Sequence, residues 1–86
     1  MSPETKDYSV IAHQLQSQIN SGNYGDKIGG TSVSIVPYSD SIDTIISGGG
    51  MMDREGTAKV VRSAGRSLGL NAETESGEST ITVTLT

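Results

Sequence analysis

The chain has 86 residues, a formal net charge of −4 and no cysteine, phenylalanine or tryptophan. Its length predicts one small domain over residues 1–86. The core must be thin, because apolar residues make up only 33% of the chain. The lack of cysteine excludes a disulfide or a thiolate metal site. No apolar run is long enough for a signal peptide or a membrane span, so we expect a cytoplasmic protein without a membrane partner.

Residues 4–21 predict a first helix. Ser2 and Pro3 suit the N-cap and the first helical position, and Gly22 ends the pattern. Apolar side chains recur at helical spacing: Tyr8, Ile11, Ala12, Leu15 and Ile19. The single histidine, His13, falls off this stripe and has no nucleophile or carboxylate spaced to work with it, so we expect no catalytic residue.

The middle of the chain predicts a loop, a short strand and a second helix. Residues 22–30 have loop composition, and residues 31–36 alternate in polarity, as is typical of a strand. A short helix is expected from about Asp40, with Ser39 or Asp40 as its cap. Its buried stripe would be formed by Ile42, Ile45 and Ile46, and the glycines at 48–50 would end it.

Residues 57–68 predict a third helix with two opposed faces. The basic side chains share one stripe: Lys59, Arg62 and Arg66. The apolar side chains share the other: Val60, Val61, Ala64 and Leu68. Gly69 suits the left-handed residue that ends a helix. A basic patch on an acidic body predicts attraction of an anionic ligand to one place, and the alternative is an ordinary solvated helix face.

The C-terminal residues predict a β-hairpin around a two-residue Ser76-Gly77 turn. This register sets Ala72 opposite Ile81 and Leu70 opposite Val83, and a longer turn is an alternative. The threonines at 80, 82, 84 and 86 fall on the other face. We expect that face to be solvated, or to form an edge where a second copy pairs in a homodimer.

The predicted order is helix, strand, helix, helix, strand, strand, which is the order of the winged-helix fold. That α+β fold packs three helices on a small antiparallel sheet. Residues 8–28 also resemble the opening of GntR-type bacterial repressors. The matching positions are Tyr8, Ile11, Ala12, Leu15, Ile19, Ser21, Gly22, Tyr24, Gly25 and Asp26. The resemblance implies a DNA-binding protein, either a transcriptional regulator or an accessory factor, that reads the major groove with helix 57–68.

The expected contacts to double-stranded DNA come from the basic helix and the residues just before it. They are Arg54, Lys59, Arg62, Ser63 and Arg66. Arginines at 62 and 66 would reach guanine, and the lysine would contact a phosphate. No metal or cofactor is expected, because the acids do not form a calcium loop and the glycines lack the spacing of a phosphate loop.

The hairpin that would form the wing is acidic, with Glu73, Glu75 and Glu78. A wing that contacts phosphates is expected to be basic or neutral. Together with the negative net charge, this favours an alternative function. In that alternative, the chain is a non-catalytic protein-interaction module or inhibitor on a similar α+β scaffold, and its partner is a protein.

Overall fold

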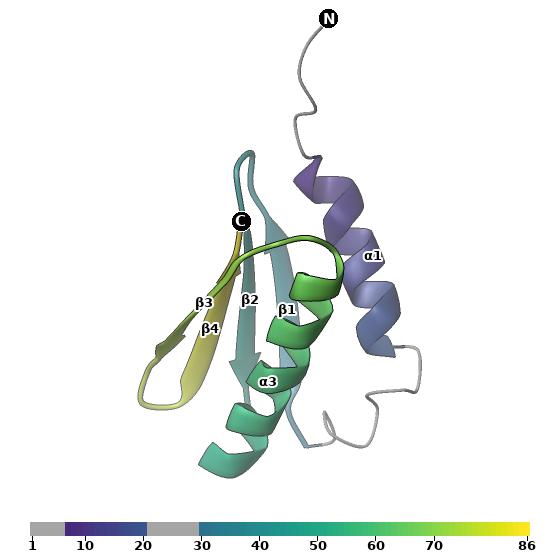
Figure 1. Cartoon of the computed structure of the whole chain (residues 1–86). Coiled ribbons are helices and arrows are strands. Elements are labelled where there is room, and N and C mark those ends of the chain that lie inside the picture. The colour runs from purple at the N-terminus through teal and green to yellow at the C-terminus, as the bar shows by residue number, and fades with distance from the viewer. Residues whose placement is uncertain (1–6, 21–29) are drawn as a thin grey trace, which may run out of the picture.

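The computed structural model describes residues 7–20 and 30–86 of the chain. This part forms two helices and four strands. In chain order they are α1 Tyr8–Asn20, β1 Ser32–Pro37, β2 Ile42–Ser47, α3 Met51–Ser67, β3 Ala72–Ser76 and β4 Thr80–Leu85. Both helices cover the same face of one antiparallel sheet, so the described chain forms two layers (Figure 1).

The strands lie in the order β1-β2-β4-β3. Because β4 is antiparallel to both of its neighbours, β2 and β3 are parallel, and α3 crosses between them. This is a split β-α-β unit with β4 inserted. The whole connectivity is a circular permutation of the ferredoxin-like β-α-β-β-α-β arrangement, opened before its second helix. A shared topology carries no function by itself.

The register of the strands places mostly apolar side chains on one face of the sheet and mostly polar side chains on the other. Successive residues of a strand point to opposite faces of the sheet. The face under the helices is built from aligned rows, of which one is Ile35, Thr44, Val83 and Thr74, and another joins Ile42 to Leu85. Neither α1 nor α3, the helices of the described residues, covers the opposite face, which carries mostly hydroxyl and acidic side chains.

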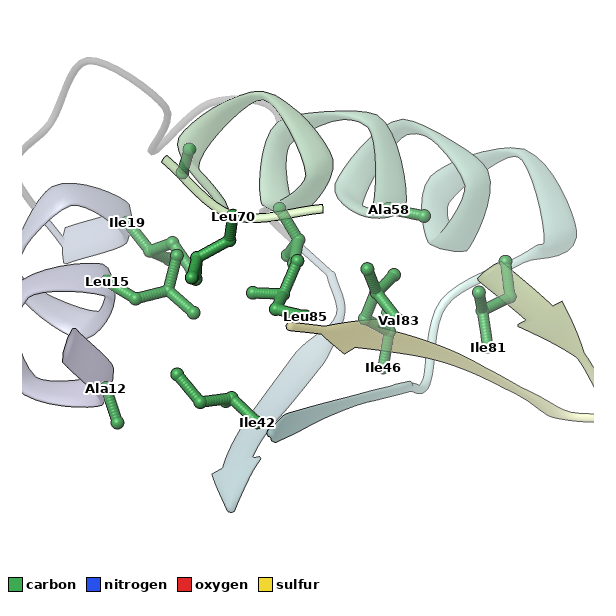
Figure 2. Packing of buried hydrophobic residues seen from close by; sticks show 12 residues of the cluster. Ala12, Leu15, Ile19, Ile42, Ile46, Ala58, Leu70, Ile81, Val83 and Leu85 are labelled. Carbon is green, nitrogen blue, oxygen red and sulfur yellow. The ribbon is translucent and has the colours of Figure 1, made fainter. Parts of the chain in front are cut away.

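The hydrophobic core lies between the helices and this inner face (Figure 2). It consists of Ala12, Leu15, Ile19, Ile42, Ile46, Ala58, Val61, Ala64, Leu70, Ile81, Val83 and Leu85. In Figure 2, Leu15 and Ile19 of α1 point toward Leu70, so the segment after α3 closes the gap between the two helices. No aromatic side chain is among these residues. The core therefore depends on close approach of aliphatic groups.

The first helix begins at Tyr8 because Asp7 caps it. The Asp7 Oδ1 atom accepts from the backbone N–H of Ser9 at 3.1 Å and of Val10 at 3.4 Å. The expected cap at Ser2 and Pro3 lies outside the described residues, as does the stop at Gly22. The predicted apolar stripe is correct, since Ala12, Leu15 and Ile19 are buried.

The third predicted helix exists but begins six residues earlier, at Met51. Its start is fixed by Asp53, whose Oδ2 accepts from the Gly50 N–H at 3.1 Å. Its end at Gly69 is as predicted. The Gly69 φ angle is +84°, and the N–H groups of Gly69 and Leu70 donate to the carbonyls of Arg66 and Gly65. These two bonds form a Schellman motif.

The helix predicted from about Asp40 is wrong, because residues 42–47 form strand β2. Ile42, Ile45 and Ile46 fit a helical stripe, but Ile42, Thr44 and Ile46 also alternate and are the buried positions. Four of the residues at 42–46 are β-branched, which favours a strand. As a central strand, β2 pairs on one side with its hairpin partner β1 and on the other with β4, which is distant in sequence, so its backbone hydrogen bonds are satisfied on both sides.

This strand overturns the expected winged-helix architecture. The described chain has two helices and four strands in the order α-β-β-α-β-β, where three helices and a smaller sheet were expected. The basic helix is a crossover between two parallel strands and packs on the sheet along its length. It is therefore not the second helix of a helix-turn-helix unit.

The C-terminal hairpin is present with a longer turn than the two-residue turn first considered. Its last pair is Ser76 with Ile81, and the Gly77 N–H donates to the Thr80 carbonyl at 2.7 Å. Ala72 consequently opposes Leu85, four residues beyond the predicted partner. The shift is even, so the predicted faces are unchanged. Strand β4 is central, however, so its threonines do not form a sheet edge.

Candidate functional site

All five residues predicted to contact DNA lie on α3, but they do not form one uniform surface. Lys59, Ser63 and Arg66 are exposed, whereas Arg54 and Arg62 are half-buried. The two half-buried arginines both hydrogen-bond within the chain. The five predicted contact residues therefore divide into an exposed group and two arginines that are engaged within the chain.

Arg54 stabilises the connection between β2 and α3. Its Nη1 donates to the carbonyl oxygens of Gly49 at 2.9 Å and Gly48 at 3.3 Å. Both of these glycines have positive φ angles, so the guanidinium holds the glycine turn between β2 and α3. This contact gives Arg54 a local structural role, and its contact with DNA stays a prediction.

Arg62 reaches across to the edge of the sheet. Its Nη1 donates to the Thr74 Oγ1 of β3 at 2.9 Å. The space between α3 and β3 is a cleft of about 290 Å³. Its lining includes two cations, Lys59 and Arg62, and two hydroxyls, Thr74 and Ser76. We call this the α3–β3 cleft; Glu55, Ala58 and Ile81 complete its lining.

Sequence reasoning found the two cations of this cleft and missed the two hydroxyls. The two-residue turn had placed Ser76 at the tip of the hairpin. The actual register extends β3 to Ser76 and turns Thr74 and Ser76 toward α3. The alternation of residues 72–76 indicates these hydroxyls, because in a strand Thr74 and Ser76 share one face of the sheet while Glu73 and Glu75 share the opposite face.

The uncovered side of the sheet is a second candidate surface, which we call the open sheet face. It consists of Ser32, Ser34, Val36, Asp43, Ile45, Ser47, Glu73, Glu75, Thr80, Thr82 and Thr84. None of these strand residues is basic, and three are acids. Ile45 lies in the central row between Ser34 and Thr82, and 37% of its surface is exposed.

The acids on this face are held by the strand register. Asp43, Thr84 and Glu73 occupy one row across three strands. The Thr84 hydroxyl donates to Asp43 Oδ1 at 3.2 Å. Glu75 lies in the next row on that face, opposite Thr82 and not opposite Glu78 as the shorter turn implied. The carboxylates therefore lie on the face of the sheet that points away from the basic helix.

His13 lies in a groove of about 330 Å³ between α1 and β1. The described residues that line the groove are Ser9, Ala12, His13, Gln16, Ile35 and Pro37, and none of these carries a carboxylate that could orient the imidazole. Within residues 7–20 and 30–86, no three His, Cys, Asp or Glu side chains are grouped to hold a metal ion. Neither helix of the described chain is long and apolar enough to cross a membrane.

No protein-family model, curated protein or solved structure matches this chain. The geometry of the two surfaces is therefore the basis for assigning a function. The open sheet face is acidic and rich in hydroxyls, and the side of α3 remote from it is basic.

Proposed function

We propose that this chain is a non-catalytic protein-interaction module that docks a basic protein surface on its open sheet face. The observation that carries the proposal is the charge of that face. Asp43, Glu73 and Glu75 share it, and none of its strand residues is basic. Lysine and arginine side chains of a partner are the chemistry that complements it.

The arrangement of the face supports recognition by a flat or extended surface. Asp43 and Glu73 are two strands apart in one row, which corresponds to roughly 10 Å at the usual strand spacing. Thr84 between them supplies a hydroxyl and already donates to Asp43, so that carboxylate is held in place before binding. Ile45 provides an apolar contact near the middle of the face.

Charge also decides against two other occupants of this face. A second copy packed with its own open sheet face against this one would bring acids against acids, and a nucleic acid would bring phosphates against them. Each arrangement is repulsive because no basic strand residue is available to neutralise it. A protein partner with a basic patch is the remaining occupant that the electrostatics favours.

The proposal is tested by affinity capture from the source cell with three matched baits. These are the wild-type chain, Glu73→Gln/Glu75→Gln, and Glu55→Gln as a control that removes an acid from α3 on the other layer. The expected result is a partner with a basic surface that is retained by wild type and Glu55→Gln and lost by the double variant. Its retention should also fall as salt is raised. If the double variant retains every protein that wild type retains, this function is wrong.

A direct measurement does not depend on knowing the partner. An oligolysine peptide is titrated into the isotope-labelled protein, and backbone amide shifts are followed by NMR. We expect the largest shifts on β2, β3 and β4 around Asp43, Glu73 and Glu75. Shifts of equal size around Asp53 and Glu55 would indicate only general attraction to an acidic protein, and would contradict a dedicated face.

DNA binding by α3 is the second candidate function. The observation that favours it is that Lys59, Ser63 and Arg66 are exposed along one helix. The acids of β3 lie on the open sheet face and point away from that helix. We expect any affinity for a DNA duplex to be low and its salt dependence shallow, because few cations are available for phosphates. Arg66→Ala should weaken binding by roughly 1–3 kcal/mol if this residue reads a base. Unchanged binding in Lys59→Ala and Arg66→Ala removes this candidate.

A further inference from the structure

We propose that the α3–β3 cleft binds a phosphate monoester dianion, which makes it a second binding site independent of the open sheet face. The cleft brings together one guanidinium, one ammonium and two hydroxyls from elements that are distant in sequence. These are the groups that recognise a phosphoryl group, since each donates hydrogen bonds and two of them carry positive charge.

Arg62 is the principal ligand in this proposal. It is half-buried, so its charge is less screened by water than that of the exposed cations on the same helix. One of its five N–H donors is used on Thr74, which directs the guanidinium toward β3 at the cleft. The remaining donors are available to a bound anion without a change in the position of the side chain.

The hydroxyls of β3 complete the site. Because the Thr74 oxygen accepts the Arg62 N–H, its own hydrogen can be directed to another acceptor in the cleft. Ser76 lies two residues along the same strand, faces the same side and lines the same cleft. Two hydroxyl donors on strand β3 and two cations on helix α3 line the same cleft, so together they can contact several phosphate oxygens.

Lys59 and Glu55 determine which ligand charge the cleft favours. They are one helical turn apart, and both line the cleft. Lys59 and Arg62 supply two positive charges, and Glu55 in the same lining supplies one negative charge, so the lining remains positive overall. Glu55 opposes a ligand whose negative charge extends beyond one phosphoryl group. The cleft therefore fits a terminal phosphate ester better than the continuous phosphodiester backbone of DNA.

The test is an NMR titration at about pH 7.5, where a phosphate monoester is mostly a dianion because its second pKa is near 6. The probes are inorganic phosphate, phenyl phosphate and a short DNA duplex, all at constant ionic strength. The first two probes should produce saturable shifts that are centred on Lys59, Arg62, Thr74 and Ser76. A duplex that gives no saturable shift at those residues supports the preference for a monoester. Phosphate shifts that do not saturate overturn the site.

Two variants of α3 distinguish phosphate binding in the cleft from general electrostatic attraction to the basic helix. We expect Arg62→Gln to weaken phenyl phosphate binding by about tenfold, because a charge-assisted hydrogen bond is lost. Arg66→Gln is the matched control on the same helix. It removes the same charge one turn away, outside the residues that line the cleft, and should change binding by less than about twofold. Equal weakening by the two variants contradicts the proposal.

Two further variants keep the test decisive if Arg62→Gln perturbs the fold. Ser76→Ala removes one hydroxyl and should weaken binding by about threefold. Glu55→Gln removes the opposing charge and should tighten binding by roughly threefold. Opposite signs from two substitutions in one cleft cannot arise from a common loss of stability. If Glu55→Gln weakens binding or Ser76→Ala leaves it unchanged, the assignment of these ligands is wrong.

Discussion

Gly65 lies where α3 packs closely against Leu85 of β4, and it offers a sharp test of the packing. A Cβ atom at this position would lie 2.7 Å from Leu85 Cδ2 and 3.2 Å from Leu85 Cδ1. Leu85 is fully buried in the core beneath the helix, with 0% of its surface exposed (Figure 2). Its methyl groups therefore cannot move into solvent to make room, and Gly65→Ala must displace the helix or the leucine.

Gly56 on the same helix provides a matched comparison. A Cβ there meets nothing within 4 Å, so Gly56→Ala adds helix propensity without a clash. That gain is about 0.5–1 kcal/mol. Gly65→Ala has the same gain but adds overpacking, which typically costs about 1–3 kcal/mol. Because the propensity contribution is common to both, the difference between the two variants isolates the packing cost, and we expect it to be about 1–3 kcal/mol.

Urea unfolding followed by circular dichroism measures this difference from the two midpoints, provided that the slopes agree. In thermal unfolding, each kcal/mol corresponds to a shift of about 4–8 °C for a domain of this size. Leu85→Val shortens the clashing side chain, so the cost of Gly65→Ala should shrink in that background. A Gly65→Ala variant as stable as Gly56→Ala would refute the close contact between α3 and β4.

Three further substitutions test individual hydrogen bonds by the same unfolding assay. Thr44 and Thr57 are both fully buried, yet Thr44 Oγ1 has no hydrogen-bond partner in the described part of the chain. Thr44→Val should therefore stabilise the protein by about 1–2 kcal/mol, and a loss of stability would show that the hydroxyl is satisfied. Thr57 donates to the Asp53 carbonyl at 3.0 Å and shares a 2.9 Å hydrogen bond with Thr31. Thr57→Val should destabilise by about 1–2 kcal/mol, and opposite signs for the two threonines are the diagnostic result. Asp53→Ala removes the bond to the Gly50 N–H and should cost about 1 kcal/mol, whereas an unchanged midpoint would mean that the cap contributes nothing.

The local features that the sequence predicts correctly are those decided within a few residues. The apolar stripe of the first helix is correct because residues at helical spacing must share a face, whatever they pack against. Gly69 ends α3 because a left-handed residue is needed there and glycine adopts it without strain. The assignment of hairpin side chains to the two faces of the sheet is also correct, since alternation alone determines which side chains share a face.

The errors arise where a distant partner decides the outcome. Ile42, Ile45 and Ile46 satisfy both a helical and a strand pattern, and the pairing of this segment with β1 and β4 selects the strand. The hairpin register is shifted by four residues, so that Ala72 and Leu85 extend the row that Ile42 and Pro37 form across the sheet. No turn residue carries that information.

The candidate surfaces divide in the same way. The amino-acid order alone concentrates cations on one helix and acids on the strand that follows it. The packing of the elements turns Arg62 toward Thr74 to form a cleft and directs Glu73 and Glu75 to the open sheet face, away from the helices. The physical reason is that periodicity assigns residues to faces within one element. Which faces meet depends on how the elements pack around a shared core.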